Sequence, residues 1–207
     1  MFKAMPSPPT RPALRARYEA RRAEVVAAAA RLFAERGYHG TSIEDLMEAT
    51  GLTRGGLYHY MDGKQDLLIA ILDELMEPLL AQAREIVARP GSAEEHLRAV
   101  TRAWLAHVAA HRDHMVVFNQ ERRTLERDAG WAHVRAARRA FEALLDDILR
   151  RGAQEGEFAI ADPQLARLAL LGMGNHTAQW FAPGGRLDAE QIADGYCALL
   201  LDGIRAR

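Results

Sequence analysis

The sequence predicts an all-α fold of about nine helices, with a small three-helix N-terminal domain followed by a larger helical C-terminal domain. Apolar residues recur at three- and four-residue spacing along most of the 207 residues, which is the pattern of amphipathic helices. The intervals between these stretches are short and rich in Gly, Pro and Asp, and no stretch shows the two-residue alternation of a strand. We expect residues 15–64 to form the first domain and residues 65–207 the second.

The N-terminal segment has four prolines in its first 12 residues and little apolar surface, so residues 1–14 are expected to form a disordered arm. The first helix is predicted from about Arg15 to Arg36, where Gly37 ends it. Arginines are concentrated at this end of the chain, at Arg11, Arg15, Arg17, Arg21 and Arg22. Such an arm either lies along nucleic-acid phosphates or forms a charged leader in solvent, and the sequence leaves both open.

Residues 41–64, TSIEDLMEATGLTRGGLYHYMDGK, predict two short helices joined by a tight turn. Ser42 is placed to cap the first helix, and Gly51 to end it in the left-handed conformation that glycine adopts at little steric cost. Thr53 is placed to cap the second helix, predicted from Arg54 to about Met61. Two short helices around a glycine-containing turn are typical of the helix-turn-helix, whose second helix enters the major groove of DNA.

The second of these helices carries side chains that a purely structural helix does not need. Gly55 and Gly56 each disfavour a helix by about 1 kcal/mol relative to alanine, which indicates that another molecule approaches the backbone closely. Arg54 and Tyr58 are predicted to face solvent and contact DNA. The alternative, for Tyr58 and for Tyr60, is that the ring packs against the first helix of the pair.

The charges of the chain are divided between its two parts. Residues 1–64 contain ten Lys plus Arg against seven Asp plus Glu, whereas the remainder is net acidic and the whole chain has a formal charge of −1. This separation suits a basic DNA-contacting domain on a body that does not touch phosphate. Cys197 is the only cysteine, and no long apolar run predicts a membrane span or a signal peptide, so a cytoplasmic protein without a membrane partner is expected.

The segments LFAERGY, TSIEDL and GLTRGGLY, with Lys64 and the leucine pair 67–68, together resemble the N-terminal domain of the TetR family of transcriptional regulators over residues 22–68. Met61 and Gly63 stand where the family usually has Phe and Ser, and Met61 fills the same apolar slot. The resemblance implies a ligand-responsive repressor without enzymatic activity that binds an inverted-repeat DNA operator as a homodimer. It also implies that Lys64 contacts a phosphate. Pattern and resemblance together give the candidate DNA-contacting residues Thr41, Thr53, Arg54, Gly55, Tyr58, His59 and Lys64.

The C-terminal part is predicted as helix after helix. Ser92 with Glu95 forms a capping box, and Asp162 before Pro163 forms a cap followed by a first-turn proline. The last two helices carry apolar residues over much of their circumference, which indicates burial on more than one side. In the family the corresponding pair forms a four-helix bundle with its twin, which implies dimerisation through Leu168, Leu171, Gly172, Leu199, Leu200 and Ile204. The alternative is that both helices pack only on their own core.

A ligand pocket is expected between the middle helices. Its candidate lining residues, each of which could instead be plain core, are Trp104, Val108, Phe118, Arg122, Leu125, Phe141, Leu145, Asn175 and Trp180. The segments ERRTL and LLGMGNHTAQWFAPGGRLDAEQIADGY are similar to a subgroup that senses acyl-CoA thioesters in lipid or steroid breakdown. Arg122, Arg123 and Arg186 are the residues placed to meet the anionic end of such an effector. A neutral apolar effector, as in regulators of drug-efflux genes, remains the alternative.

His107, His111 and His114 fall at metal-ligand spacing on a continuous helix, but a break near Arg112 would separate them. A solvated polar face is therefore preferred to a metal site, and no cofactor is expected. No G-x-S-x-G, phosphate loop or H-E-x-x-H motif indicates an enzyme. The remaining alternative to a regulator is a helical adaptor protein without specific DNA binding.

Overall fold

The computed structural model describes residues 11–127 and 131–204, and of residues 123–127 and 203–204 it describes only the backbone. The helices of this part of the chain agree with the predicted all-α fold, and they are α1 (Pro12–Arg36), α2 (Ile43–Thr50), α3 (Arg54–Leu57), α4 (Lys64–Val87), α5 (Ala93–Ala110), α6 (Arg112–Arg127), α7 (Ala132–Gln154), α8 (Pro163–Trp180) and α9 (Ala189–Ile204).

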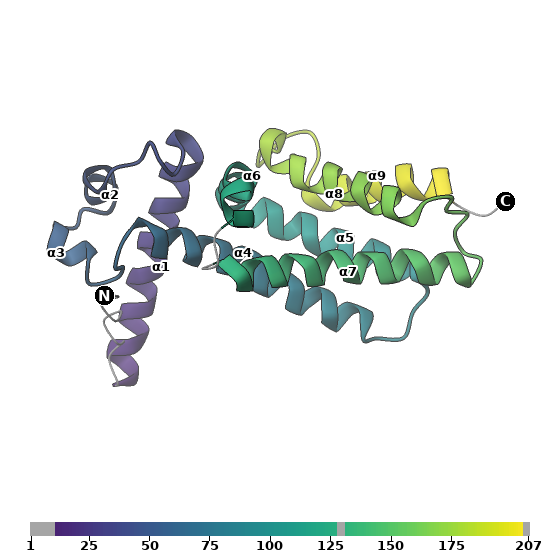
Figure 1. Cartoon of the computed structure of the whole chain (residues 1–207), viewed down its shortest axis with the longest axis horizontal. Helices are drawn as coiled ribbons and strands as arrows, with labels where there is room; N and C mark the ends of the chain where they lie inside the picture. The colour runs from purple at the N-terminus through teal and green to yellow at the C-terminus, as the bar shows by residue number, and fades with distance from the viewer. Residues whose placement is uncertain (1–10, 128–130, 205–207) are drawn as a thin grey trace.

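The helices form two groups that α4 connects (Figure 1). Helices α1, α2 and α3 lie at one end of the molecule, and α5, α7, α8 and α9 run alongside one another at the other end. The long helix α4 packs on α1 in the first group and on α5 and α7 in the second. Helix α6 bridges the groups too, since it contacts both α1 and α8. Any shift of α4 or α6 therefore reaches both groups.

Several helix ends follow from local sequence as predicted. The Ser42 and Ser92 hydroxyls accept hydrogen bonds from the backbone three residues on, and both helices have a complete capping box. Asp162 accepts from the Leu165 amide at 3.1 Å, before the proline that opens α8. Each cap satisfies backbone donors that the first turn of a helix leaves free.

The first helix begins earlier than predicted, at Pro12 instead of about Arg15. Proline is favourable in the first turn because its fixed backbone angle suits a helix and its missing N–H is not needed there. The predicted disordered arm therefore overlaps α1 at residues 12–14, and its first ten residues lie outside the described part of the chain.

The apolar core runs without interruption through both groups of helices. In the first group it contains Phe33, Leu46 and Leu57, and Met61 fills the apolar slot predicted for it, with no exposed surface. In the second group the largest fully covered side chain is that of Trp104. Within the described residues, none of the helices has the length and apolar character that a membrane crossing requires.

Candidate functional site

The turn between α2 and α3 has the geometry of a helix-turn-helix. Gly51 ends α2 with φ of 67°, a left-handed backbone conformation that residues other than glycine rarely adopt. Thr53 then caps α3, its hydroxyl accepting a hydrogen bond from the Gly56 amide at 3.2 Å. Leu57 on the inner side of α3 is fully buried and fixes the helix on the domain core.

The second helix of the pair is shorter than predicted, because α3 ends at Leu57 and not near Met61. The chain continues in turns, in which the amides of His59 and Tyr60 donate to carbonyls three residues earlier. The adjacent glycines weaken the helical conformation here, and the tighter pattern replaces it.

Most of the predicted DNA-contacting residues lie together on the exposed side of α3 and the turn after it. Thr53, Arg54, Gly55 and His59 are exposed, and the Tyr58 side chain is 40% exposed. A Cβ at Gly55 would meet no atom within 4 Å, so the backbone is open to a close approach there. The nearest anion to Arg54 is Glu44, at 3.8 Å and highly exposed, which leaves the guanidinium easy to redirect.

Tyr60 differs from Tyr58 in its surroundings. Its ring lies 5.2 Å from the ring of Tyr18 on α1 and is only partly exposed. His59 also contacts Tyr18, edge to face at 5.5 Å. The packing alternative therefore describes Tyr60, although the partner is α1 and not α2, whereas Tyr58 is the exposed tyrosine of the pair.

The structure turns two predicted contact residues inward. The Thr41 side chain is 1% exposed, and its hydroxyl donates to the Gly37 carbonyl at 2.9 Å, so it is corrected from a surface residue to a buried one. The Lys64 ammonium donates to the carbonyls of Tyr38 and Thr41 at 2.9 and 2.6 Å and lies over the Tyr38 ring. These contacts explain how a lysine is tolerated at the start of α4, and its phosphate contact stays a prediction.

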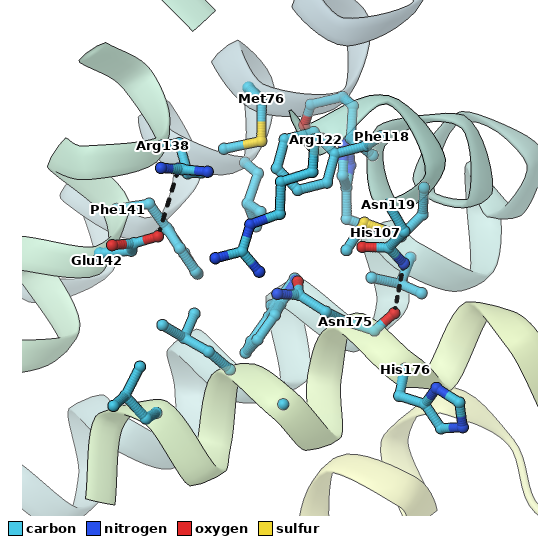
Figure 2. A pocket seen from close by; sticks show the side chains of 18 of the residues that line it. Met76, His107, Phe118, Asn119, Arg122, Arg138, Phe141, Glu142, Asn175 and His176 are labelled. Atoms are coloured by element: carbon cyan, nitrogen blue, oxygen red, sulfur yellow. Dashed lines mark hydrogen bonds and ion pairs between the residues drawn. The ribbon is translucent and has the colours of Figure 1, made fainter. Parts of the chain in front are cut away.

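The second candidate site is a cavity of about 540 Å³ inside the C-terminal group of helices (Figure 2). It is enclosed by α4, α5, α6, α7 and α8, with mostly apolar walls on α4 and α5 and polar groups on the other three helices. Its lining residues include six of the predicted ones: Trp104, Val108, Phe118, Arg122, Phe141 and Asn175. Three of the predicted dimer residues, Leu168, Leu171 and Gly172, line it as well.

Two of the predicted pocket residues that the structure describes do not line this cavity. Leu145 is fully buried in the core, and Trp180 is 49% exposed beyond the end of the cavity, so both are corrected. The side chain of Leu125 lies outside the described residues, as does that of Arg123. Arg186 is exposed in the segment between α8 and α9 and is not among the lining residues.

Besides the predicted Arg122 and Asn175, the walls contain the unpredicted polar residues Asn119, Arg138 and Glu142. In Figure 2 the Arg122 side chain extends from α6 into the cavity, opposite the Arg138–Glu142 pair on α7. The Asn119 amide donates to the backbone carbonyl of Asn175 at 2.9 Å and ties α6 to α8 at another wall. Arg138 and Glu142 are four residues apart on the apolar face of α7, and this spacing was the available sequence signal for them.

The exposed apolar residues of the last two helices form a candidate dimer surface. Leu168 on α8 is 51% exposed and Leu199 on α9 is 71% exposed. Leu165, one turn before Leu168 on α8, is 63% exposed. Leu200 is partly buried, and the side chain of Ile204 lies outside the described residues. Large exposed leucines on adjacent helices are typical of an interface with another chain.

The predicted break in the histidine stretch occurs at His111, between α5 and α6, yet it does not separate the rings. His111 lies 4.5 Å from His107 and 5.3 Å from His114 by ring centroids. His107 contacts the Leu75 carbonyl at 2.8 Å, and His114 contacts Glu74 at 3.3 Å. Within the described residues no group of His, Cys, Asp and Glu is arranged to hold a metal ion.

Burial lowers the pKa of His107, and the neighbouring His111 lowers it further. Burial likewise lowers the pKa of His111, with a second contribution from His114. The neutral form of both imidazoles is therefore favoured in the folded protein. His107 on α5 and His114 on α6 both contact α4, so this group of histidines joins α4, α5 and α6.

Comparison with known proteins identifies the family to which a chain with these two sites belongs. Residues 25–71 match the family described as bacterial regulatory proteins of the tetR family, and residues 90–204 match the tetracyclin repressor-like C-terminal domain. The chain belongs to the TetR family. The first match contains the helix-turn-helix, and the second contains α5 to α9 with most of the cavity, so the chain is a TetR-family transcriptional regulator.

Two proteins similar over nearly the whole chain are transcriptional repressors of the same name. The repressor KstR2 of Rhodococcus jostii is 29% identical over 91% of its own length and 89% of this chain. The solved structure of the ketosteroid transcriptional regulator KstR2 of Mycobacterium tuberculosis has a TM-score of 0.86 and 27% identity, covering 90% of this chain and 96% of that chain. These similarities are consistent with the steroid and lipid catabolism subgroup predicted from the C-terminal half.

A third similar structure contains both kinds of ligand. AibR in complex with isovaleryl coenzyme A and operator DNA has a TM-score of 0.77 and is 31% identical, over 87% of this chain and 98% of that chain. AibR therefore combines DNA binding with acyl-CoA binding in a fold similar to this one.

Proposed function

We propose that this chain is a homodimeric repressor that binds an inverted-repeat operator and is released from it by an acyl-CoA thioester. The observation that carries the proposal is the position of the cavity, whose walls include α4, the helix that also packs on the DNA-binding domain. A ligand in this cavity contacts the element that positions α3, and ligand occupancy is thereby coupled to DNA affinity.

The proposed DNA-contacting surface consists of Arg54, Gly55, Tyr58 and His59, with Thr53 at the start of α3. Arg54 supplies a guanidinium for a base edge or a phosphate, and Gly55 admits close approach of the DNA to the backbone. Two copies of α3 reach successive major grooves only in a two-fold dimer. The exposed leucines of α8 and α9 provide the apolar surface for that dimer.

The proposed effector combines an apolar acyl group with an anionic carrier, because the cavity offers surfaces for both. Leu75, Leu79 and Phe118 belong to the apolar walls, and Arg122 extends into the space from α6. A volume of about 540 Å³ lies in the usual range for small-molecule sites, which is enough for an acyl group but leaves the nucleotide part of a coenzyme outside. The complex of AibR with isovaleryl coenzyme A supports this class of effector.

The transmission route that we propose starts at the apolar wall on α4. Leu75, Met76 and Leu79 line the cavity, and the same helix begins at Lys64, whose ammonium holds the carbonyls of Tyr38 and Thr41. A ligand that displaces the middle of α4 thus changes the position of the α1–α2 connection relative to the body. The two copies of α3 then no longer match successive major grooves.

The test is fluorescence-anisotropy titration of the full chain onto DNA fragments tiled from the flanks of its own gene, repeated with isovaleryl-CoA and octanoyl-CoA. The proposal predicts saturable binding to an inverted repeat and release by at least one thioester. Free coenzyme A is the control, and it should not release the DNA. Binding without release would contradict the effector class, and absence of specific binding would contradict the repressor itself.

A further inference from the structure

The wall of the cavity formed by α7 and α8 contains a cluster of charged side chains, to which the proposed function gives no role. Glu142 of α7 lies between two arginines that also line the cavity. Its Oε1 is 3.5 Å from Nε of Arg138, and its Oε2 is 3.3 Å from Nη1 of Arg167 on α8. The three side chains are largely covered, with exposed fractions of 20%, 26% and 14% for Arg138, Glu142 and Arg167.

Arg167 also pairs with a second carboxylate, and the two carboxylates differ in whether they face the cavity. Asp146, one turn beyond Glu142 on α7, lies with Oδ1 2.8 Å from Nε of Arg167. Asp146 does not line the cavity, whereas Glu142 does. If another anion replaced Glu142 on the cavity side of Arg167, the guanidinium would therefore still be paired with Asp146. Of the two anions, only Glu142 stands where a ligand would stand.

We propose that this wall is a carboxylate-binding subsite, in which a carboxylate of the effector replaces Glu142 between Arg138 and Arg167. The proposal rests on the proposed function, since it assumes that the cavity is the effector site. An incoming carboxylate matches the subsite because the group that it replaces has the same charge and the same two oxygens. A neutral ligand group would leave two largely buried guanidiniums without that anion, which is unfavourable in a covered site.

The subsite defines the chemical class of the effector more narrowly than an acyl thioester. The apolar walls take a hydrocarbon body, and the wall formed by α7 and α8 takes a carboxylate at one end of it. A thioester of a dicarboxylic acid carries such a group on its acyl part, and a free fatty acid carries it without any coenzyme. Both share the recognised chemistry, and the experiment distinguishes them.

The test compares octanoyl-CoA, suberyl-CoA and free octanoate by isothermal titration calorimetry with the wild type, Glu142→Gln and Asp146→Asn. The two substitutions each remove one negative charge beside Arg167 from the same face of α7, so Asp146→Asn is the matched control. We expect suberyl-CoA or octanoate to bind Glu142→Gln about fivefold to tenfold more tightly than the wild type, which corresponds to about 1 kcal/mol. We expect octanoyl-CoA to change less than about twofold, and Asp146→Asn to change all three ligands equally little.

The outcomes separate the subsite from the proposed function. Tightening of suberyl-CoA alone assigns the carboxylate to a thioester, and tightening of octanoate alone assigns it to a free acid. If Glu142→Gln tightens octanoyl-CoA as much as suberyl-CoA, the arginines receive a coenzyme phosphate and the carboxylate subsite is wrong. If octanoyl-CoA releases DNA and Glu142→Gln alters no ligand, the subsite fails and the repressor proposal stands. If no probe binds any variant, the subsite and the effector class both fail.

Discussion

The indole of Trp104 lies directly on the backbone of Gly174, where a Cβ would come within 2.3 Å of the ring. Trp104 is 2% exposed and is held on another side by Phe141, edge to face at 5.4 Å. The ring is therefore confined on these two sides, and this contact between α5 and α8 holds Trp104 in the wall of the cavity.

This contact predicts opposite effects for two neighbouring substitutions. Gly174→Ala should lower the free energy of unfolding by about 1–3 kcal/mol, because the methyl group overlaps the indole. Gly172→Ala should raise it by up to about 1 kcal/mol, because its Cβ meets no atom within 4 Å and alanine favours a helix. Urea denaturation of both variants measures the difference. Equal effects in the same direction would contradict the packing described here.

The roles of Arg54 and Lys64 are distinguished by the salt dependence of DNA binding. Arg54→Ala should weaken binding and reduce the slope of log affinity against log salt by about 1 if its guanidinium contacts a phosphate. Lys64→Met should lower thermal stability, because two carbonyls lose their charged donor, and should leave the slope unchanged. A reduced slope for Lys64→Met would instead assign it the predicted phosphate contact.

The proposed dimer surface predicts a change of mass with single substitutions on α9 and α8. Leu199→Glu, and separately Leu168→Glu, should convert the dimer to a monomer because each places a charge at a large exposed apolar position. Leu14→Glu is the matched control, since Leu14 is 47% exposed on α1, away from both helices. Multi-angle light scattering measures the mass. A monomeric wild type, or dimeric variants at both positions, would argue against this surface.

The partly buried histidines His107 and His111 predict a loss of stability in acid. Because the pKa values of His107 and His111 are lowered from 6.5 in the folded protein, the unfolded chain binds protons more readily below that pH. The stability that they contribute is complete above about pH 6.5 and is lost as the pH falls through the folded-state values. Melting temperatures between pH 7.5 and 5.5 should therefore fall less steeply for His107→Gln than for the wild type. His59→Gln, at an exposed position in the turn after α3, should match the wild type.

The features that the sequence predicted well are those decided within a few residues. The caps at Ser42, Ser92 and Asp162 depend on one side chain and the next turn of backbone, so their chemistry is readable locally. The length of α3 was overestimated because helical spacing of apolar residues continues to Met61, whereas the paired glycines end the helix at Leu57. The low helix propensity of glycine therefore decided the length of α3, and the spacing of its apolar residues did not.

The cavity walls were predicted only in part, because they depend on how distant helices pack. The aromatic residues Trp104 and Phe141 were predicted correctly, but Trp180 was predicted as well and is not among the lining residues. Arg167 approaches Glu142 across 25 residues of sequence, and no local pattern indicates that pair. Thr41 and Lys64 were predicted as DNA contacts, and in the structure the polar groups of both side chains donate to backbone carbonyls.

The most direct test of the central claim is the reciprocity of ligand and DNA binding. The affinity of octanoyl-CoA should be measured by calorimetry for the free protein and for its complex with the inverted repeat, and the affinity for DNA with and without the thioester. Coupling through α4 predicts that each ligand weakens the other by the same factor, about 5-fold to 150-fold. Octanoyl-CoA that binds equally well to the free and the DNA-bound protein would contradict a ligand-released repressor.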